Sequence, residues 1–366
     1  MRIVFLSIGG HIHTERWLAY FVRRGHEVHL ITTDPVPIEG VTVHELRTGM
    51  PWKPLHYGVG VFRLRRLLSR IKPELFHVHF LRGFGYWAVF AGMRPMVLTV
   101  WGDDVYKAPY LSRIRYRLSR RAIEMADAVT GDSRDILAEV ERLGADPRKL
   151  HLVLWGVDFD IFHPVNGGSF RSEWDIPGDA PLVLSTRSFT RDYYNIDVIL
   201  DMVPGLVERV PGAIVAFAAY DGDGKELRAR AARMGVEDSV RFTGRIDHGR
   251  LPLAYSAADV YITVPSLDAT AVSLLEAMAC GDAIIASDLP SNREWIVDGE
   301  NGFIVPPRDL EALTGRTVEL LRDPVTRERF GKRCIDIARQ RAGYEENMSY
   351  VENLCESLIA KYRGSS

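Results

Sequence analysis

The chain has 366 residues, of which 46% are hydrophobic and 26% charged, and its formal net charge is −2 at pH 7. This balance is typical of a folded protein of about two domains and excludes a disordered tail, a collagen-like repeat and a disulfide-rich miniprotein. The three cysteines, Cys280, Cys334 and Cys355, form no CxxC pair, so we expect a reducing compartment and neither a disulfide framework nor a structural zinc site.

The first half of the chain alternates short apolar strands with helices. Residues 2–8 (RIVFLSI) predict a buried strand, which Gly9 and Gly10 interrupt, and a helix is expected over residues 14–24. With a strand at residues 27–32, this is the spacing of a βαβ unit. Further strands are expected at residues 75–80, 96–100, 128–131 and 150–154, and helices near residues 58–71 and 110–126.

The same alternation restarts near residue 182. Two tandem runs of this kind predict an α/β protein with two Rossmann-like domains, each a doubly wound parallel sheet. The last fifty residues are expected to be helical, including an amphipathic stretch at 347–362. In the second run, strands are expected at residues 182–186, 213–218, 240–243, 259–263 and 283–286, and helices at residues 195–209, 224–234, 250–257 and 270–280.

The domain boundary is expected in the segment FHPVNGGSF, residues 162–170, which is rich in Gly, Pro and Asn. We therefore predict an N-terminal domain over residues 1–165 and a C-terminal domain over residues 166–345. A C-terminal helix at 346–363 is expected to pack back on the first domain. Parallel sheets bind ligands at the carboxyl ends of their strands, so two such domains facing an interdomain cleft suit a reaction between two substrates.

Charge is divided unevenly along the chain. Residues 1–165 hold 23 basic and 17 acidic side chains, whereas residues 48–121 alone hold 14 basic and 3 acidic ones. Such a segment attracts phosphates or anionic lipid headgroups, and nearby aromatic residues suit a membrane interface. The alternative is a pair of ordinary solvated helix faces.

No stretch reaches the ~18 apolar residues needed to span a bilayer. The N-terminal run MRIVFLSIGG is shorter than a signal peptide, so it is interpreted as a strand. We expect a cytoplasmic protein, with residues 48–121 as the part that would attach it peripherally to the inner face of the membrane.

The turn after the first strand carries Gly9 and Gly10, which offer close backbone approach and N–H groups at a helix start. These features suit a phosphate or a sugar. The spacing is not the GxGxxG fingerprint of dinucleotide binding, and an NAD site is not favoured even though Asp34 ends the second strand. A tight turn without a ligand is the alternative.

The most informative stretch is residues 264–286, VPSLDATAVSLLEAMACGDAIIA. A strand ends there, a loop with Asp268 follows, and a helix is expected to open near Thr270. The backbone N–H groups of Thr270, Ala271, Val272 and Ser273 would lie unpaired at the positive end of this helix, which suits a diphosphate. Glu276, further along, is placed to accept hydrogen bonds from the two hydroxyls of a ribose.

This stretch resembles the E-x7-E signature of glycosyltransferase family 4, the retaining, sugar-nucleotide-dependent enzymes of the GT-B fold. The resemblance extends over nearly the whole chain. It includes RRGHEVHLIT, FHVHF, TVWGDD and GVDFDIFHP in the first half, and DGDGKEL, VRFTGRI, LEAMACG and VDGENGFIVPP in the second.

The resemblance implies roles for individual positions. Asp268 matches the first acid of the signature, which approaches the donor sugar, and Glu276 the second, which holds the ribose. Residues 270–273 match the phosphate-binding helix start, and Gly222 and Gly224 the glycine-rich loop. Arg187 matches the arginine that contacts the donor diphosphate, a task that a guanidinium fork suits because it engages two oxygens.

Three positions depart from the family pattern. The first acid is usually Glu and is here Asp268. Tyr194 falls where a lysine is usual, and Arg191 is the obvious substitute cation. The usual His-Gly-x-Asp is here Trp101-Gly102-Asp103-Asp104, in which Trp101 either stacks on a sugar or fills the site wall. Asp104 either binds the acceptor or caps a helix.

The histidines and acidic pairs do not suggest a metal site. We expect His77 and His79 to point to opposite faces of their strand, with His79 near the acceptor and His77 structural. His248 is expected in a surface turn. Asp221-Gly222-Asp223 has the spelling of a DxD motif but sits in a glycine-rich turn.

The leading hypothesis is thus a retaining, metal-independent hexosyltransferase without a cofactor. Its donor would be a UDP- or GDP-linked sugar, and Asp268, Arg187 and Arg191 would be catalytic. The basic segment favours a lipid-linked or phosphate-bearing acceptor, as in glycolipid or polysaccharide synthesis, and no nucleic acid is expected. The alternatives are a small soluble acceptor, a non-catalytic binding subunit of the same fold, or another GT-B enzyme such as a sugar-nucleotide epimerase.

Overall fold

The computed structural model describes residues 1–47, 53–219, 222 and 224–364, and divides them between two compact units. Unit 1 consists of Met1–Trp155 together with Glu345–Ser366, and unit 2 is the continuous segment Gly156–Tyr344. The division after Trp155 falls earlier than the boundary expected at residue 165, and residues 156–165 belong to unit 2. The sequence rule located a Gly/Pro-rich stretch, but that stretch lies inside unit 2.

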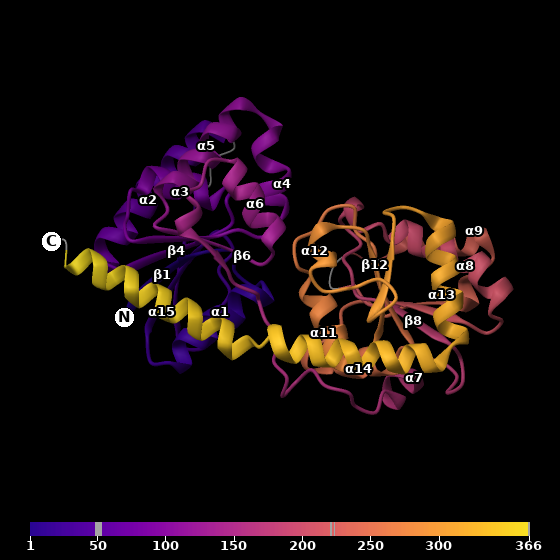
Figure 1. Cartoon of the computed structure of the whole chain (residues 1–366). Coiled ribbons are helices and arrows are strands. Elements are labelled where there is room, and N and C mark those ends of the chain that lie inside the picture. Colours follow the sequence, from indigo (N-terminus) through magenta and orange to yellow (C-terminus); the bar gives the residue numbers. More distant parts are fainter. Residues whose placement is uncertain (48–52, 220–221, 223, 365–366) are drawn as a thin grey trace. The chain divides into compact units, whose positions relative to one another are not determined.

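Unit 1 contains a seven-stranded parallel sheet in its described part, in the order β3-β2-β1-β4-β5-β6-β7. Helices α2, α3 and α5 lie on one face, and α1 and α15 on the other (Figure 1). The strands are β1 (Arg2–Leu6), β2 (Glu27–Thr32), β3 (Val41–Glu45), β4 (Leu75–His79), β5 (Met96–Thr99), β6 (Ala128–Gly131) and β7 (Leu150–Leu152). The helices are α1 (Ile12–Arg23), α2 (Lys53–Ile71), α3 (Phe84–Ala91), α4 (Asp103–Tyr106), α5 (Arg113–Met125), α6 (Arg134–Arg142) and α15 (Tyr344–Arg363).

Unit 2 contains a six-stranded parallel sheet among its described residues, in the order β10-β9-β8-β11-β12-β13. Helix α8 packs against α13, while α11 packs against α10 and α14. The strands are β8 (Leu182–Ser185), β9 (Ile214–Phe217), β10 (Val240–Phe242), β11 (Val260–Thr263), β12 (Ala283–Ser287) and β13 (Gly302–Val305). The helices are α7 (Gly168–Glu173), α8 (Ile196–Arg209), α9 (Lys225–Met234), α10 (Leu251–Ala257), α11 (Val272–Cys280), α12 (Pro290–Arg293), α13 (Leu310–Arg322) and α14 (Pro324–Arg341).

Both sheets are covered by helices, which explains the near-continuous apolar runs of their central strands. Residues 3–6 of β1 and 182–184 of β8 have no exposed surface. Strands buried on both faces carry Val, Ile and Leu at successive positions rather than alternating with polar residues. The predicted fold class, two Rossmann-like parallel-sheet domains, is therefore confirmed.

The strand order of each sheet determines where its ligand site is expected. The order reverses between β1 and β4 in unit 1 and between β8 and β11 in unit 2. At such a switch point, the loops beyond two neighbouring strands diverge to opposite faces and leave room for a ligand. The residues just after these four strands are therefore the ones to examine.

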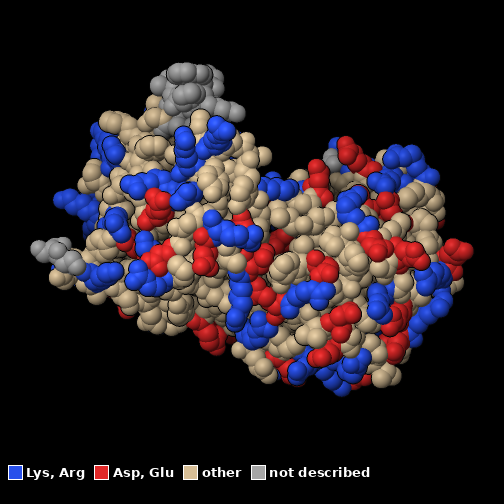
Figure 2. All heavy atoms as spheres, turned by 45° about the horizontal axis from the view of Figure 1, so that its top comes forward, with Lys and Arg blue, Asp and Glu red and all other residues tan. Residues whose placement is uncertain are grey.

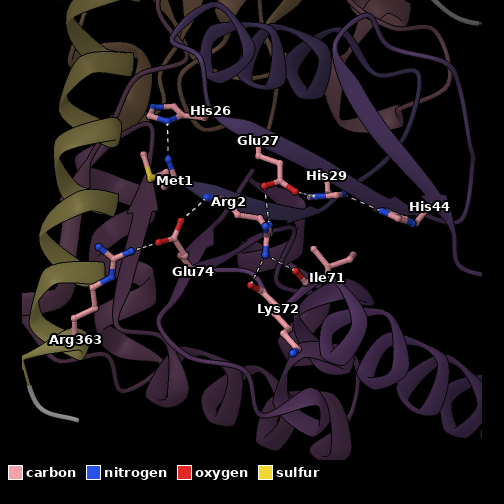
Figure 3. A network of polar contacts seen from close by, with 10 residues as sticks. All are labelled: Met1, Arg2, His26, Glu27, His29, His44, Ile71, Lys72, Glu74 and Arg363. Atoms are coloured by element: carbon pink, nitrogen blue, oxygen red, sulfur yellow. Dashed lines mark hydrogen bonds and ion pairs between the residues drawn. The ribbon is translucent and has the colours of Figure 1, made fainter.

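Helix α15 is joined to unit 1 by polar contacts along its length. Glu352, which is nearly buried, accepts from the Tyr20 hydroxyl at 2.9 Å and from Nε of Arg24 at 3.0 Å, and it lies 2.7 Å from Nε2 of His26. At the far end, Arg363 pairs with Glu74 (Figure 3).

The same network continues to the amino-terminal edge of the sheet (Figure 3). The Glu74 carboxylate accepts from the backbone N–H of Arg2 at 2.6 Å, and the amino group of Met1 lies 3.1 Å from Nδ1 of His26. The first and last described segments of the chain therefore meet in unit 1.

Candidate functional site

Arg187 and Asp268 meet at the switch point of unit 2. Arg187 follows β8 and Asp268 lies in the loop after β11, and the two side chains form an ion pair. The guanidinium also donates to Oγ of Ser273 at 3.2 Å, and its central carbon lies 3.9 Å from the ring centre of Tyr194. The structure thus brings together three residues that the sequence analysis assigned to the donor site, and adds the Tyr194 ring.

The Asp268 side chain is largely covered, with 16% of it exposed. Burial raises its pKa above the ordinary value, although the charge of Arg187 acts in the opposite direction. Its Oδ1 accepts from the backbone N–H of Ala269 at 3.1 Å, and its carbonyl oxygen accepts from the Ser291 hydroxyl at 3.0 Å. The loop conformation therefore directs the carboxylate toward Arg187.

Helix α11 begins beside this ion pair. It starts at Val272, two residues later than the expected start at Thr270, and Ala271 precedes it without a side-chain cap. The first backbone N–H groups of a helix have no partner within the helix, so those at this end are available to water or a ligand. Thr270 is positioned by the indole N–H of Trp295, which donates to its hydroxyl at 3.2 Å.

Glu276 lies on α11 and is nearly buried. One carboxylate oxygen accepts from the Tyr255 hydroxyl at 3.1 Å, and the other lies 3.2 Å from Nε2 of His248. The Tyr255 hydroxyl is also 3.2 Å from that of Thr186, just after β8. A carboxylate fixed in this way keeps capacity for further donors, as a ribose diol would require.

His248 and Tyr255 are the residues that sequence reasoning missed. His248 was expected only in a surface turn, but its ring is largely covered and packs edge-on against Phe162 at 4.9 Å between centres. The predicted turn is confirmed, since residues 248–250 form a 3-10 turn. A pairing with Glu276, far along the chain, leaves no local signal.

The glycine-rich loop after β9 lies against the loop after β8. Gly222 and Gly224 have φ angles of 77° and 63°, a region that side chains other than glycine rarely adopt. A Cβ on Gly224 would come 3.1 Å from the Phe189 ring. Arg191, in the same loop as Phe189, is exposed. Asp221 and Asp223 lie outside the described residues.

Gly9 and Gly10 occupy the turn after β1 in unit 1. A Cβ on Gly9 would lie 1.7 Å from the carbonyl oxygen of Asp34, and the Gly9 N–H donates to the Thr32 hydroxyl at 2.9 Å. Gly10 has a φ of 64°. Close packing on the segment after β2 accounts for Gly9, and the positive φ accounts for Gly10. Their binding of a ligand stays a prediction.

His79 lies at the end of β4 and is fully buried. Its ring packs edge-on against Trp17 at 5.0 Å and lies 5.9 Å from Trp101 and 6.0 Å from Trp155, between ring centres. Burial lowers its pKa well below the ordinary value, so the ring is neutral at physiological pH. It belongs to the wall of an aromatic cluster that also includes His11 and His13.

The prediction that His77 and His79 point to opposite faces is wrong. Their rings lie 4.9 Å apart, on the same face of β4. Side chains alternate along a strand, so residues two apart share a face. His77 is structural as expected, because its Nε2 lies 2.7 Å from the Thr99 hydroxyl in the core.

Asp104 is fully buried and binds backbone groups. Its two oxygens accept from the N–H groups of Leu81, Trp101 and Gly102 at 2.7, 3.0 and 2.8 Å. Burial raises the pKa of this carboxyl to about 6 although all three bonds act to lower it. Asp104 is the second residue of α4, whose N-cap Gly102 has no side-chain cap, so it holds the backbone before the helix rather than capping it. Trp101 is partly exposed and stays a candidate for acceptor binding.

A basic and apolar face is formed by α2, α3 and α5 of unit 1, which pack side by side. Figure 2 shows Lys and Arg side chains on this side of the unit, with uncharged surface between them. Phe62 on α2, Phe90 on α3 and Ile114 on α5 are 67%, 50% and 71% exposed there. The exposed arginines are Arg63, Arg65, Arg66, Arg70, Arg113, Arg115, Arg117, Arg120 and Arg121. Residues 48–52 of the predicted basic segment lie outside the described residues.

The described part of the chain contains no group of three His, Cys, Asp or Glu side chains placed to hold a metal ion. Within the same residues, no helix is both long and apolar enough to cross a membrane. All three cysteines are buried and reduced.

Comparison with known families matches each unit separately. Residues 168–336 match the family described as glycosyl transferases group 1, and residues 2–133 match the family described as glycosyl transferase 4-like. The chain belongs to glycosyltransferase family 4. The resemblance inferred from the signature around Asp268 and Glu276 is thus confirmed at the level of the family.

Two curated relatives carry inositol-related names, and a third is named N-acetyl-alpha-D-glucosaminyl L-malate synthase, of Bacillus anthracis, at 22% identity over 92% of this chain and 90% of the relative. The chain is 36% identical over 176 residues to phosphatidyl-myo-inositol mannosyltransferase of Mycobacterium leprae, covering 47% of this chain and 46% of the relative. It is 28% identical over 248 residues to D-inositol 3-phosphate glycosyltransferase of Kribbella flavida, covering 65% and 57%. The chain thus spans about half the length of the two inositol-related relatives.

Solved structures share the GT-B fold over nearly the full length. Sucrose-phosphate synthase from Thermosynechococcus elongatus has a TM-score of 0.84 at 20% identity, covering 99% of this chain and 100% of the other. Anabaena HepE in complex with UDP-glucose also has a TM-score of 0.84, at 16% identity, covering 98% and 100%.

Proposed function

We propose that this protein is a retaining hexosyltransferase that moves a sugar from a nucleoside diphosphate sugar to a lipid-linked or phosphate-bearing acceptor. The observation that carries the proposal is the cluster at the switch point of unit 2. There Arg187, the start of α11 and the Glu276 carboxylate lie on neighbouring elements beyond β8 and β11.

Each group of this cluster has a task in the proposed reaction. Glu276 accepts hydrogen bonds from the ribose hydroxyls, and the N–H groups of residues 270–273 bind the diphosphate together with Arg187. Arg191 adds a second cation to the leaving group. Charge that develops on the departing diphosphate is stabilised by donors already in place, so we expect no metal requirement.

The donor is proposed to be UDP- or GDP-linked, and Asp268 to approach its sugar with retention at the anomeric carbon. Family membership supports both points, and a structural neighbour of the same fold holds UDP-glucose. Gly222 and Gly224 allow the loop after β9 to lie close to the donor.

The acceptor is proposed to bind unit 1. The names of two relatives refer to phosphatidyl-myo-inositol and to inositol phosphate, which supports a phosphate-bearing acceptor. The basic and apolar face of α2, α3 and α5 supports peripheral attachment to an anionic membrane that presents a lipid-linked acceptor. Trp101 and His79 are proposed to form part of the acceptor wall. Gly9 and Gly10, in the turn after β1, are proposed to contact the donor. A small soluble acceptor is the alternative.

Donor binding is tested by titrating UDP, GDP and ADP into the protein in a calorimeter. We expect one diphosphate to bind and Glu276→Ala to weaken it about tenfold, because two ribose hydrogen bonds are lost. Glu319→Gln, an exposed carboxylate on α13, is the control and should leave the affinity unchanged. Binding of none of the three diphosphates would contradict the proposal and favour a non-catalytic subunit.

Metal independence is tested with the same protein and its donor. Because Arg187, Arg191 and backbone N–H groups are proposed to stabilise the leaving group, EDTA should leave the rate of sugar release unchanged. A rate that disappears with EDTA and returns with manganese would overturn this part of the proposal.

A further inference from the structure

The Arg187 guanidinium is already occupied at three sides. It pairs with the Asp268 carboxylate, donates to Ser273 at 3.2 Å and stacks on the Tyr194 ring at 3.9 Å. Only 8% of the side chain is exposed. A ligand that approaches this arginine therefore meets a group whose fork already holds a carboxylate.

A carboxylate and a phosphate compete for the same N–H groups of a guanidinium. A guanidinium binds either one through parallel N–H groups, and the directions that suit one also suit the other. Asp268 reaches Arg187 from a loop that also presents α11, the element proposed to bind the diphosphate. The carboxylate thus takes the place of a phosphate group.

Arg187 has little freedom to turn toward a new partner, because Tyr194 is fixed from behind. The next residue, Asn195, donates to the carbonyl oxygen of Val264 at 2.8 Å and to the Ser266 hydroxyl at 2.7 Å. Its own amide oxygen accepts from Arg308 at 2.8 Å. The Tyr194 ring therefore keeps the guanidinium plane in one orientation, and an incoming anion has to replace Asp268.

We propose that Asp268 occupies the phosphate position on Arg187 while the donor site is empty, and that the donor diphosphate displaces it toward the transferred sugar. This inference rests on the proposed function. Tyr194 acts in it as a positioning residue that holds Arg187 for both partners. The exchange couples the two steps, because Asp268 is released toward the sugar only when a diphosphate has reached Arg187.

The exchange lowers the affinity for a ligand that has a diphosphate but no sugar. A nucleoside diphosphate alone displaces Asp268 and leaves its buried carboxylate without a replacement partner, whereas sugar hydroxyls supply one. Asp268→Asn removes the competing charge. We therefore expect this variant to bind UDP, or whichever diphosphate the wild type binds, about tenfold more tightly.

Asp268→Asn should increase the affinity for the corresponding nucleoside diphosphate sugar by a smaller factor, since the contact of Asp268 with the sugar is lost at the same time. The matched control is Asp201→Asn, an arginine-paired aspartate on α8 whose partner Arg230 lies on α9. It removes one negative charge from the same unit, and it should change the affinity neither for the diphosphate nor for the diphosphate sugar. Calorimetry on all three proteins gives these values directly.

Crystal structures of the wild type without ligand and with UDP test the exchange without any variant. We expect the contact between Arg187 and Asp268 in the first and phosphate oxygens on Arg187 in the second. An Asp268→Asn variant that binds the diphosphate equally or more weakly overturns the proposal, as does a contact that persists in the complex. If the wild type binds no diphosphate at all, the proposed function itself fails and the exchange fails with it.

Discussion

Asp104 shows how much one buried carboxylate can organise. Its two oxygens collect three backbone N–H groups from the ends of β4 and β5, and they fix the turn that presents Trp101. A carboxylate can accept in all these directions, whereas an amide carries two donors on one side. The residue therefore determines the backbone conformation from which Trp101 projects.

This geometry makes Asp104→Asn destabilising. The amide nitrogen would face a backbone N–H group and leave it unpaired, at a cost of about 1–3 kcal/mol in the free energy of unfolding. Urea denaturation measures the change. Asp103→Asn next to it is the control, since Asp103 forms a long ion pair with the half-exposed Arg82 at 3.4 Å. Equal effects of the two substitutions would contradict the assignment.

At this scale the sequence predicted the residues that a contiguous motif carries. Asp268, Glu276 and the helix start between them lie within one stretch, and the structure brings them to the switch point with Arg187. His248 and Tyr255 could not be predicted, because they reach Glu276 only through the packing of α10 on α11. The same holds for the stacking of Tyr194 on Arg187, which depends on the path of a loop.

Individual elements were predicted where the apolar pattern is regular. The strands β1, β2, β4, β8 and β11 match their expected positions because they are buried on both faces. Several elements were missed, among them the helices α4, α6, α7 and α12, and three further cases have different reasons. The edge strand β3 is only half-buried and carries polar residues, α3 is apolar all round and has no helical period, and β13 is short and begins with Gly302.

The attachment of α15 depends on Glu352. We expect Glu352→Gln to destabilise unit 1 by about 2 kcal/mol, because an amide cannot accept from Tyr20, Arg24 and His26 together and the ion pair is lost. Urea denaturation followed by tryptophan fluorescence measures this change. The control is Glu345→Gln on the same helix, whose pair with Arg23 is exposed and worth about 0–1 kcal/mol.

The stability that Glu352 contributes to unit 1 should decrease as the pH falls. Hydrogen bonds from His26 and Tyr20 and the charge of Arg24 lower the pKa of Glu352 below its ordinary value of 4.5, although burial acts to raise it. The unfolded state then binds more protons, so the contribution is present above pH 4.5 and is lost as the pH falls through the lowered pKa. A stability difference between wild type and Glu352→Gln that stays constant down to pH 3 would contradict this.

At the scale of the whole molecule, charge is separated between the units. Unit 1 carries 25 basic and 19 acidic side chains, whereas unit 2 carries 21 basic and 29 acidic ones. The basic excess coincides with exposed apolar side chains on α2, α3 and α5. We expect the protein to sediment with vesicles that contain phosphatidylglycerol and not with pure phosphatidylcholine vesicles.

Substitution of Arg113, Arg115 and Arg117 by Gln should weaken this binding by roughly 100-fold, since each basic residue near an anionic surface contributes about 1 kcal/mol. The control substitutes three exposed basic residues of α14 in unit 2, Lys332, Arg333 and Arg339. Equal loss in both variants, or binding that is indifferent to salt, would show that the helix face is an ordinary solvated surface.

Unit 1 is formed by two separate segments of the chain, which has a consequence for its folding during synthesis. Unit 2 is one continuous segment, whereas unit 1 needs both Met1–Trp155 and the final helix. On the ribosome, every residue of unit 2 has emerged before unit 1 receives the Glu352 carboxylate that joins α15 to Tyr20. A chain that ends before α15 would therefore keep nearly all of unit 2 and lack the helix that completes unit 1.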